Sequence, residues 1–525
     1  MADQQDQPPQ LPHRRTCCHG GSGPPGDAIT RRELLGGIAG AAVIGTMAVA
    51  AAGEQTASTK PADLVTAVGL RVKPVLVYGL YGRREFTSWR AYGGLHTRQD
   101  VDKEARRIED ELKALSSRSD FAVNVLPVAL AGTQAEAAAA AACDCDAILV
   151  YASGGSQQWL EMLAASRKPN VMFLRHKSGP IYLWYEIAHW RFLRKSEDTF
   201  KEPNMDVADI VVDDYDEVLW RLRALYGLKN AMGTKVLAIG GLVSYSAPGT
   251  KFGPDNARNV WKYDIKPVAY KDVQDRINKA RADENALKEA RRQAEELLAQ
   301  PNVTLEVDKK FVVNTFLARN VIREMMAEVG ATNVGVGDCM GGLIRILDTP
   351  PCLVLSLLND EGLTGFCHVD FTHTQPGVLL RHISGKPSFV SNSHFPYKGV
   401  ITLAHCAAPR KMDGKNCEPT RIVTHFESDY GAATKVQYTK GQVTTNIIPN
   451  LVCTKWLGFR GKILDSPFYD ICRSQMDVEI DGDWPRLLRD MQGFHTITCY
   501  GDYLREVGYA LKRVGTEWEN VSETA

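Results

Sequence analysis

The chain has no excess of charge of either sign. Lys plus Arg and Asp plus Glu each number 62 among its 525 residues. A protein that holds a nucleic-acid backbone or an anionic membrane by electrostatics needs a surplus of cations, so this balance argues against both partners. A small neutral molecule is the better first expectation for a ligand.

Two kinds of short motif are also missing. Glycines follow predicted strands at Gly79 and at Gly240, but neither place completes the G-x-G-x-x-G that opens a dinucleotide-binding helix. Cys143 and Cys145 are too close to build a tetrahedral zinc site alone, and no second pair lies at finger spacing. The sequence therefore argues against a nicotinamide cofactor and against a zinc finger. Most other cysteines lie in apolar segments, as buried thiols do.

One apolar stretch of small residues covers residues 36–52, and Arg31 and Arg32 stand just before it. The pattern resembles a twin-arginine export signal with a small-residue cleavage site. We therefore expect residues 1–52 to engage the twin-arginine translocase and the mature chain to be periplasmic or otherwise extracytoplasmic. The alternative is a retained membrane anchor, since about 17 apolar residues are just long enough to span a bilayer.

The rest of the chain predicts an α/β protein of three domains. After a small, polar linker at 53–70, strands and helices alternate over 71–230 and again over 231–330, which predicts two Rossmann-like α/β domains with parallel sheets. From 331 to 525 the texture changes to short β-rich runs with Gly and Asn turns, including PCLVLSLLND, which we expect to be a strand. Many short strands favour a barrel-like or sandwich-like C-terminal domain.

The most informative stretch is 351–409, where carboxylates and imidazoles stand between apolar runs. Such groups at strand ends are the raw material of a metal site or an acid/base site. The members of this stretch are Asp360, Glu361, His368, Asp370, His373, His394 and His405. We expect His373 and His394, together with His382, to be surface residues of a helix or loop.

The same stretch resembles the C-terminal part of L-fucose and L-arabinose isomerases. The resemblance rests on the order of an LSLLND segment, a Cys-X-X-Asp, a helix-like VLLRHISGKPSF and an AHCAAP turn. It implies an aldose–ketose isomerase that acts on a sugar through an ene-diol. It also implies a divalent metal, manganese with magnesium as the alternative, and a homo-oligomer, a trimer or hexamer.

The resemblance assigns roles residue by residue. The family's Glu-X-Asp falls on His368-Val369-Asp370, ahead of a helix over 377–384, so Asp370 takes the place of the metal ligand and acid/base group. His368 replaces the glutamate and is our candidate for a substitute base or ligand, because a free imidazole has a pKa of about 6.5. His495, in the GFHTITCYGD segment, takes the place of the distal metal ligand.

The resemblance also implies a second carboxylate that works opposite Asp370. Asp338, Asp360 and Glu361 are the candidates; we expect Glu361 to be catalytic and Asp360 to bind substrate, with a turn-capping role as the alternative for both. His405 matches a pattern seen around the site in the related proteins, so we expect it to contact substrate as well.

Another candidate wall of a sugar pocket lies near the start of the first domain. The SWRAYGG loop follows the first predicted strand, at the edge where open α/β sheets bind ligands. Trp89 can stack on a sugar ring and Arg90 can bind its hydroxyls; the alternative is a packed loop plugged by Trp89. The sequence as a whole predicts a metal-dependent sugar isomerase-like protein. A non-catalytic carbohydrate-binding derivative of the same scaffold is the alternative.

Overall fold

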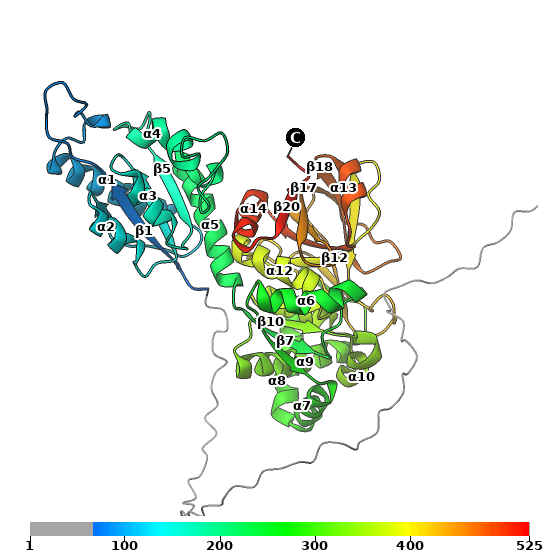
Figure 1. Ribbon diagram of the computed structural model, residues 1–525. Helices are drawn as coiled ribbons and strands as arrows, with labels where there is room; N and C mark the ends of the chain where they lie inside the picture. Colours follow the sequence, from blue (N-terminus) through cyan, green and yellow to red (C-terminus); the bar gives the residue numbers. More distant parts are fainter. Residues whose placement is uncertain (1–66, 524–525) are drawn as a thin grey trace, which may run out of the picture. The chain divides into compact units, whose positions relative to one another are not determined.

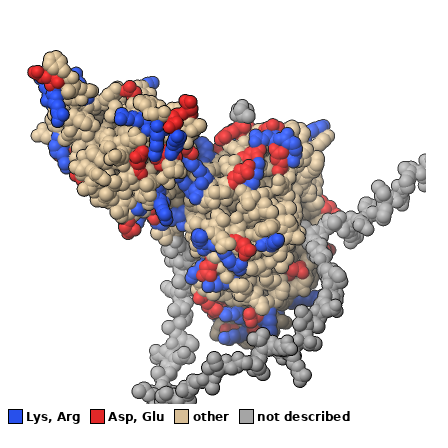
Figure 2. Space-filling model, in the orientation of Figure 1, with Lys and Arg blue, Asp and Glu red and all other residues tan. Residues whose placement is uncertain are grey.

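The computed structural model describes residues 67–523. The predicted export signal at 1–52 lies outside the described residues. Within them, no single helix is long and apolar enough to cross a membrane, and only the bent pair Cys339–Leu347 and Cys352–Asp360 has such length and composition together. On the face shown in Figure 2, Lys and Arg side chains are interspersed with Asp and Glu.

The first region is built on a parallel sheet of order β2-β1-β4-β5-β6, with β3 beside β1 (Figure 1). Every residue of β4 and β5 is buried, because helices cover both faces of such a sheet. The strands are β1 (Leu70–Val77), β2 (Val123–Val125), β3 (Ala129–Ala131), β4 (Ala147–Ala152), β5 (Asn170–Leu174) and β6 (Ile210–Val212). The helices are η1 (Tyr92–Gly94), α1 (Arg98–Arg118), α2 (Gln134–Ala141), α3 (Gln157–Ala164), α4 (Leu183–Ile187), η2 (Ala188–Leu193) and η3 (Val207–Asp209).

A second parallel sheet has the order β11-β10-β7-β8. Its strands are β7 (Lys235–Ile239), β8 (Asp264–Val268), β10 (Asn333–Val336) and β11 (Thr364–Cys367). The helices around it are α5 (Tyr215–Ala231), α6 (Ala247–Asn259), α7 (Tyr270–Ala282), α8 (Glu284–Leu298), α9 (Lys309–Val329), η4 (Cys339–Leu343), α10 (Ile344–Leu347), α11 (Cys352–Asp360) and α12 (Phe371–Ser384). The two predicted parallel sheets are thus confirmed, but the boundary expected at residue 331 falls inside the second one.

The C-terminal region holds an antiparallel barrel. Its strand order is β16-β19-β12-β13-β18-β17, and an additional pairing of β16 with β17 closes the ring, while β20 adds to β17 in parallel. The strands are β12 (Phe389–Ser393), β13 (Val400–His405), β16 (Val443–Pro449), β17 (Lys455–Asp465), β18 (Ser474–Asp481), β19 (His495–Tyr500) and β20 (Glu517–Asn520), with helices α13 (Trp484–Asp490) and α14 (Leu504–Val514). A separate small sheet joins β9 (Val303–Leu305), β14 (Thr420–Val423) and β15 (Ala433–Val436).

Two local predictions are corrected. The PCLVLSLLND segment is not a strand but helix α11, and nearly all of its residues are buried. An apolar run that is buried on every side carries no periodicity to separate helix from strand. The helix expected over 377–384 begins six residues earlier, because Asp370 caps it by accepting the N–H of Thr372. It ends at Ser384, and Gly385 caps this end with a left-handed φ of 67°.

Helix α12 is the element that positions the site described next. It packs against α5, α6 and the barrel strand β19. Almost every one of its residues is buried, Pro376 included. The helix therefore joins the edge of the second sheet to the start of a barrel strand.

Candidate metal centre

Loops at the carboxyl edge of the second sheet converge beside the barrel. Ser244 and Tyr245 follow β7, and His368 and Asp370 follow the β11 strand. In open parallel sheets this edge is where ligands bind. His495 opens β19, where it pairs with Asn392 of β12, and so reaches the same place from the barrel.

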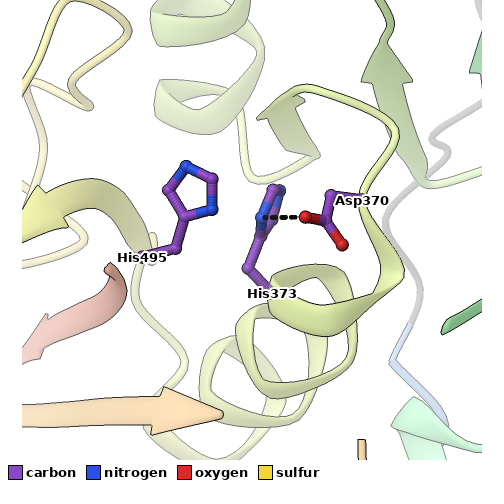
Figure 3. Close-up of side chains that lie close together, drawn as sticks. All are labelled: Asp370, His373 and His495. Carbon is purple, nitrogen blue, oxygen red and sulfur yellow. Dashed lines mark ion pairs between the residues drawn. The ribbon is translucent and has the colours of Figure 1, made fainter. Parts of the chain in front are cut away.

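Asp370, His373 and His495 form a compact cluster (Figure 3). One ligand atom from each residue lies within 4.8 Å of the others, and all three side chains are buried. Asp370 caps α12 and His373 stands three residues further on, so both occupy the same side of its first turn. Residues more than a hundred positions apart are thereby brought together by the packing of α12 on β19.

Asp370 is held firmly, whereas the imidazoles are not. Its Oδ2 accepts the Ser244 hydroxyl at 2.6 Å, its Oδ1 accepts the Thr372 N–H at 2.8 Å, and His373 Nδ1 lies 4.0 Å from Oδ2. Within the described chain, neither ring nitrogen of His373 makes a hydrogen bond of good geometry, although the backbone of Cys367 and His368 is near enough to oppose the lowering of its pKa; His495 Nδ1 has no partner. Buried polar atoms without partners are rare in folded proteins. The donor set therefore fits a cation held by one carboxylate and two imidazoles.

The electrostatics of the cluster agree with this fit. Burial lowers the pKa of His373 to about 3, and the charge of neighbouring His368 lowers it further. Burial also lowers the pKa of His495 well below its usual value, with His373 adding to the effect. Both rings are thus neutral at pH 7, which is the form of imidazole that binds metals. Two nitrogens and one oxygen suit Mn²⁺ and other transition metals better than Mg²⁺.

His368 and His405 stand close to the cluster. The His368 ring centroid is 6.4 Å from that of His495, and the residue has a left-handed φ of 69° directly after β11. His405 ends β13, where its Nδ1 accepts the N–H of Ala407 at 3.1 Å. Burial lowers the pKa of His405 to about 4. The structure therefore brings four of the sequence-predicted residues to one place: His368, Asp370, His405 and His495.

The two predicted partner carboxylates are not among them. Asp360 accepts Arg410 Nε at 2.7 Å, and Glu361 accepts Arg319 Nε at 2.6 Å. Both residues precede β11, whereas Asp370 follows it, so they lie at opposite ends of that strand. This placement gives no support to a catalytic Glu361 or a substrate-binding Asp360. Asp338, the third candidate, is exposed and accepts the N–H of Gly341 at the start of η4.

Trp89 and Arg90 line a pocket in the first region. The cavity holds about 200 Å³ and lies at the carboxyl ends of β1 and β4, where Gly79 and Ser153 also line it. The Arg90 guanidinium stands 5.7 Å from the centre of the Trp89 ring. No member of the Asp370 cluster lines this pocket, so the described chain presents two separate candidate sites.

His373 is the site residue that the sequence reasoning missed. The sequence predicts it as a surface residue of a helix or loop, but it is fully buried. The signal was present in the Asp370-X-X-His373 spacing. A carboxylate that caps a helix and an imidazole one turn later share a side of that helix.

The chain matches no protein-family model, and no curated protein is significantly similar to it.

Proposed function

We propose that this protein is a divalent-metal-dependent sugar isomerase-like enzyme that acts through an ene-diol. The observation that supports the proposal most is the buried Asp370, His373 and His495 cluster at the carboxyl edge of a parallel sheet. Three of its ring nitrogens make no hydrogen bond of good geometry with residues 67–523, which leaves them available as ligands.

The chain's own residues would share the work as follows. Asp370, His373 and His495 would hold the cation, and Ser244 fixes the orientation of the Asp370 carboxylate. A bound divalent cation would polarise the two adjacent oxygens of an open-chain sugar. His368 would take the proton from C2 of the aldose and return it to C1, because an imidazole nitrogen can accept and release a proton. Manganese is favoured over magnesium because two ligands are nitrogens.

Proton NMR in deuterated water tests this function. The full chain is incubated with Mn²⁺ and a panel of pentoses, hexoses and 6-deoxyhexoses, and exchange at C1 or C2 is followed. We expect deuterium uptake by one class of sugar, and loss of at least about 100-fold of that rate in Asp370→Asn, which removes the negative charge of the only carboxylate ligand in the cluster. The matched control is His382→Gln, on the same helix but outside the cluster, which should keep the rate. A folded, manganese-loaded protein that exchanges no sugar proton would contradict the proposal.

A second candidate function is carbohydrate binding without turnover. It is favoured by one observation: Asp370 is the only carboxylate in the cluster, since Asp360 and Glu361 are paired with arginines. Titration calorimetry separates the two functions. Saturable sugar binding that survives a chelator, with no proton exchange, would favour the binding protein; binding that requires Mn²⁺ would favour the enzyme.

Assembly and location follow from the resemblances and are proposed with the function. We propose a homo-oligomer, a trimer or hexamer, which sedimentation velocity would detect. We also propose export by the twin-arginine route. Replacing Arg31 and Arg32 together by lysine should leave the full-length chain in the cytoplasmic fraction, whereas the unchanged chain should reach the extracytoplasmic one.

A further inference from the structure

Cysteines that are far apart in the sequence gather in one part of the core. Cys352, Cys367 and Cys406 belong to the same apolar cluster, and Cys472 packs against it. They come from four different places: the start of α11, the end of β11, the turn after β13 and the loop before β18. None of these four is in a disulfide, whereas Cys143 and Cys145 are joined to each other.

Cys406 is the centre of this group. Its sulfur is hydrogen-bonded by the thiols of Cys352 and Cys472. The backbone N–H of Arg473 also points at it, with the nitrogen 3.4 Å from Sγ. Three donors that converge on one sulfur stabilise a thiolate, which is the reactive form of cysteine. In accord with this, these contacts lower the pKa of the Cys406 thiol, while its contact with Cys406 raises that of Cys352.

The group is graded in depth. Cys352 and Cys406 are 2% and 1% exposed, but Cys472 is only partly buried. A reagent from solution therefore meets Cys472 first. Cys406 lies behind Cys472 and is hydrogen-bonded to it, and the three donors to its sulfur favour the reactive thiolate form.

The thiols of this group contact one another in pairs, which suits a disulfide better than a metal site. A thiolate metal site needs three or four ligands around one point. Among residues 67–523, the only three ligand atoms found within 4.8 Å of one another are those of Asp370, His373 and His495. The thiols touch in pairs, and a pair is what disulfide chemistry uses.

We propose that Cys472 and Cys406 form a thiol–disulfide exchange site for a small disulfide such as oxidised glutathione, with Cys352 positioning the Cys406 thiolate. The Cys472 thiol gives the proton of its hydrogen bond to the Cys406 thiolate, attacks one sulfur of the small disulfide, forms a mixed disulfide and releases one thiolate, which takes the proton from Cys406. The Cys406 thiolate then attacks the Cys472 sulfur, forms the Cys406–Cys472 bond and releases the second thiolate. Two protein thiols are oxidised, one disulfide is reduced to two thiols, and the two protons leave with them. The proposal does not depend on the proposed sugar chemistry.

Peptide mapping after oxidation tests this site. The full chain is equilibrated with oxidised glutathione, its remaining thiols are alkylated, and the digested peptides are identified by mass spectrometry. We expect a linked Cys406–Cys472 peptide and two glutathione thiols released per bond. In Cys406→Ala the second step is blocked, so glutathione should remain on Cys472 at a level at least tenfold above wild type. The matched control is Cys499→Ala, a buried thiol of β19 outside the group, which should behave as wild type.

A folded wild-type chain that forms no Cys406–Cys472 link would overturn the proposal, as would equal glutathione on Cys472 with and without Cys406. Cys472→Ala serves where Cys406→Ala does not fold, because its side chain is only partly buried. It should cut the release of glutathione thiols at least tenfold, and unchanged release would also overturn the proposal.

Discussion

The carboxyl edges of the two parallel sheets treat buried polar groups in opposite ways. At the first edge, Arg175 follows β5 and is fully buried, and its Nε and Nη2 donate to Glu104 and Glu111 at 2.6 Å. Tyr182 and Tyr215 donate to the same two carboxylates. At the second edge, the buried His373 makes no hydrogen bond of good geometry within the described chain. In the first network the arginine is paired with carboxylates that also accept tyrosine hydroxyls, whereas in the second, ring nitrogens that could bind a metal make no well-formed hydrogen bond.

This difference separates a structural network from a candidate site. A buried charge is tolerated only if it is paired and hydrogen-bonded, and the Arg175 network meets that condition without a ligand. The Asp370 cluster meets it only in part, and a cation would complete it. Burial alone therefore does not mark a functional residue, whereas burial together with unsatisfied ligand atoms does.

The largest effect on stability is expected from removing Arg175 from its network of carboxylates and tyrosines. Arg175→Ala leaves Glu104 buried beside no cation, so we expect it to lower the free energy of unfolding by about 3–5 kcal/mol. Urea unfolding monitored by circular dichroism measures this. Arg71→Ala, which removes an exposed ion pair with Asp144, is the control and should cost less than about 1 kcal/mol. Equal losses in the two variants would show that the buried network is not special.

The next effect concerns the open cluster and depends on metal. His373→Leu removes a buried imidazole that makes no hydrogen bond of good geometry, so we expect the metal-free unfolding free energy to stay within about 1 kcal/mol of wild type. Wild type should gain about 2.7 kcal/mol at a manganese concentration 100 times its dissociation constant, and the variant should lose most of that gain. Thermal unfolding with and without Mn²⁺ measures both. His382→Leu should retain the gain, and a variant at residue 373 that also retains it would exclude His373 as a ligand.

A third effect is expected from the buried carboxyl group of Glu506, whose pKa is raised by burial more than the nearby arginines lower it. Burial raises the pKa of Glu506, on α14, to about 7, although Arg223 and Arg505 oppose the shift. The unfolded chain ionises this group near its ordinary pKa of 4.5 and the folded chain does not, so its contribution to stability is lost as pH rises from about 4.5 to about 7.

Glu506→Gln should therefore stabilise the protein by about 3 kcal/mol at pH 8 and change little at pH 4. Urea midpoints at the two pH values measure the difference. A variant that is stabilised equally at both would show that the ionisation of Glu506 is not the cause.

The smallest effect on stability is expected at the Trp89 pocket. Arg90 is exposed, so Arg90→Ala should change the unfolding free energy by less than about 0.5 kcal/mol. If the pocket binds sugar, the variant should weaken sugar-dependent quenching of Trp89 fluorescence several-fold. Arg83→Ala is the matched control, because Arg83 also lies over the Trp89 ring, 5.9 Å from its centre, but does not line the pocket. Identical quenching curves for wild type, Arg90→Ala and Arg83→Ala would contradict a sugar-binding role and favour the alternative, in which Trp89 only packs within its loop.

Sequence reasoning recovered the two parallel sheets because alternating strands and helices leave a strong periodic signal. It failed where that signal is absent. The segment that became α11 is apolar on every side, so helix and strand could not be distinguished. That error placed Asp360 and Glu361 at a strand end beside Asp370, whereas the helix puts them before β11, next to arginines from α9 and from the loop after β13.

The residues at the cluster divide in the same way. Asp370 and His495 were selected from the sequence by the order of motifs around them. His373 was not selected, because its exposure depended on where α12 begins. The sequence by itself determined the two parallel sheets, the β-rich C-terminal region and the ligand types available. Only the tertiary structure decided which of those ligands meet, because packing of α12 on β19 sets distances between residues that the local sequence does not encode. The same holds for the thiols around Cys406.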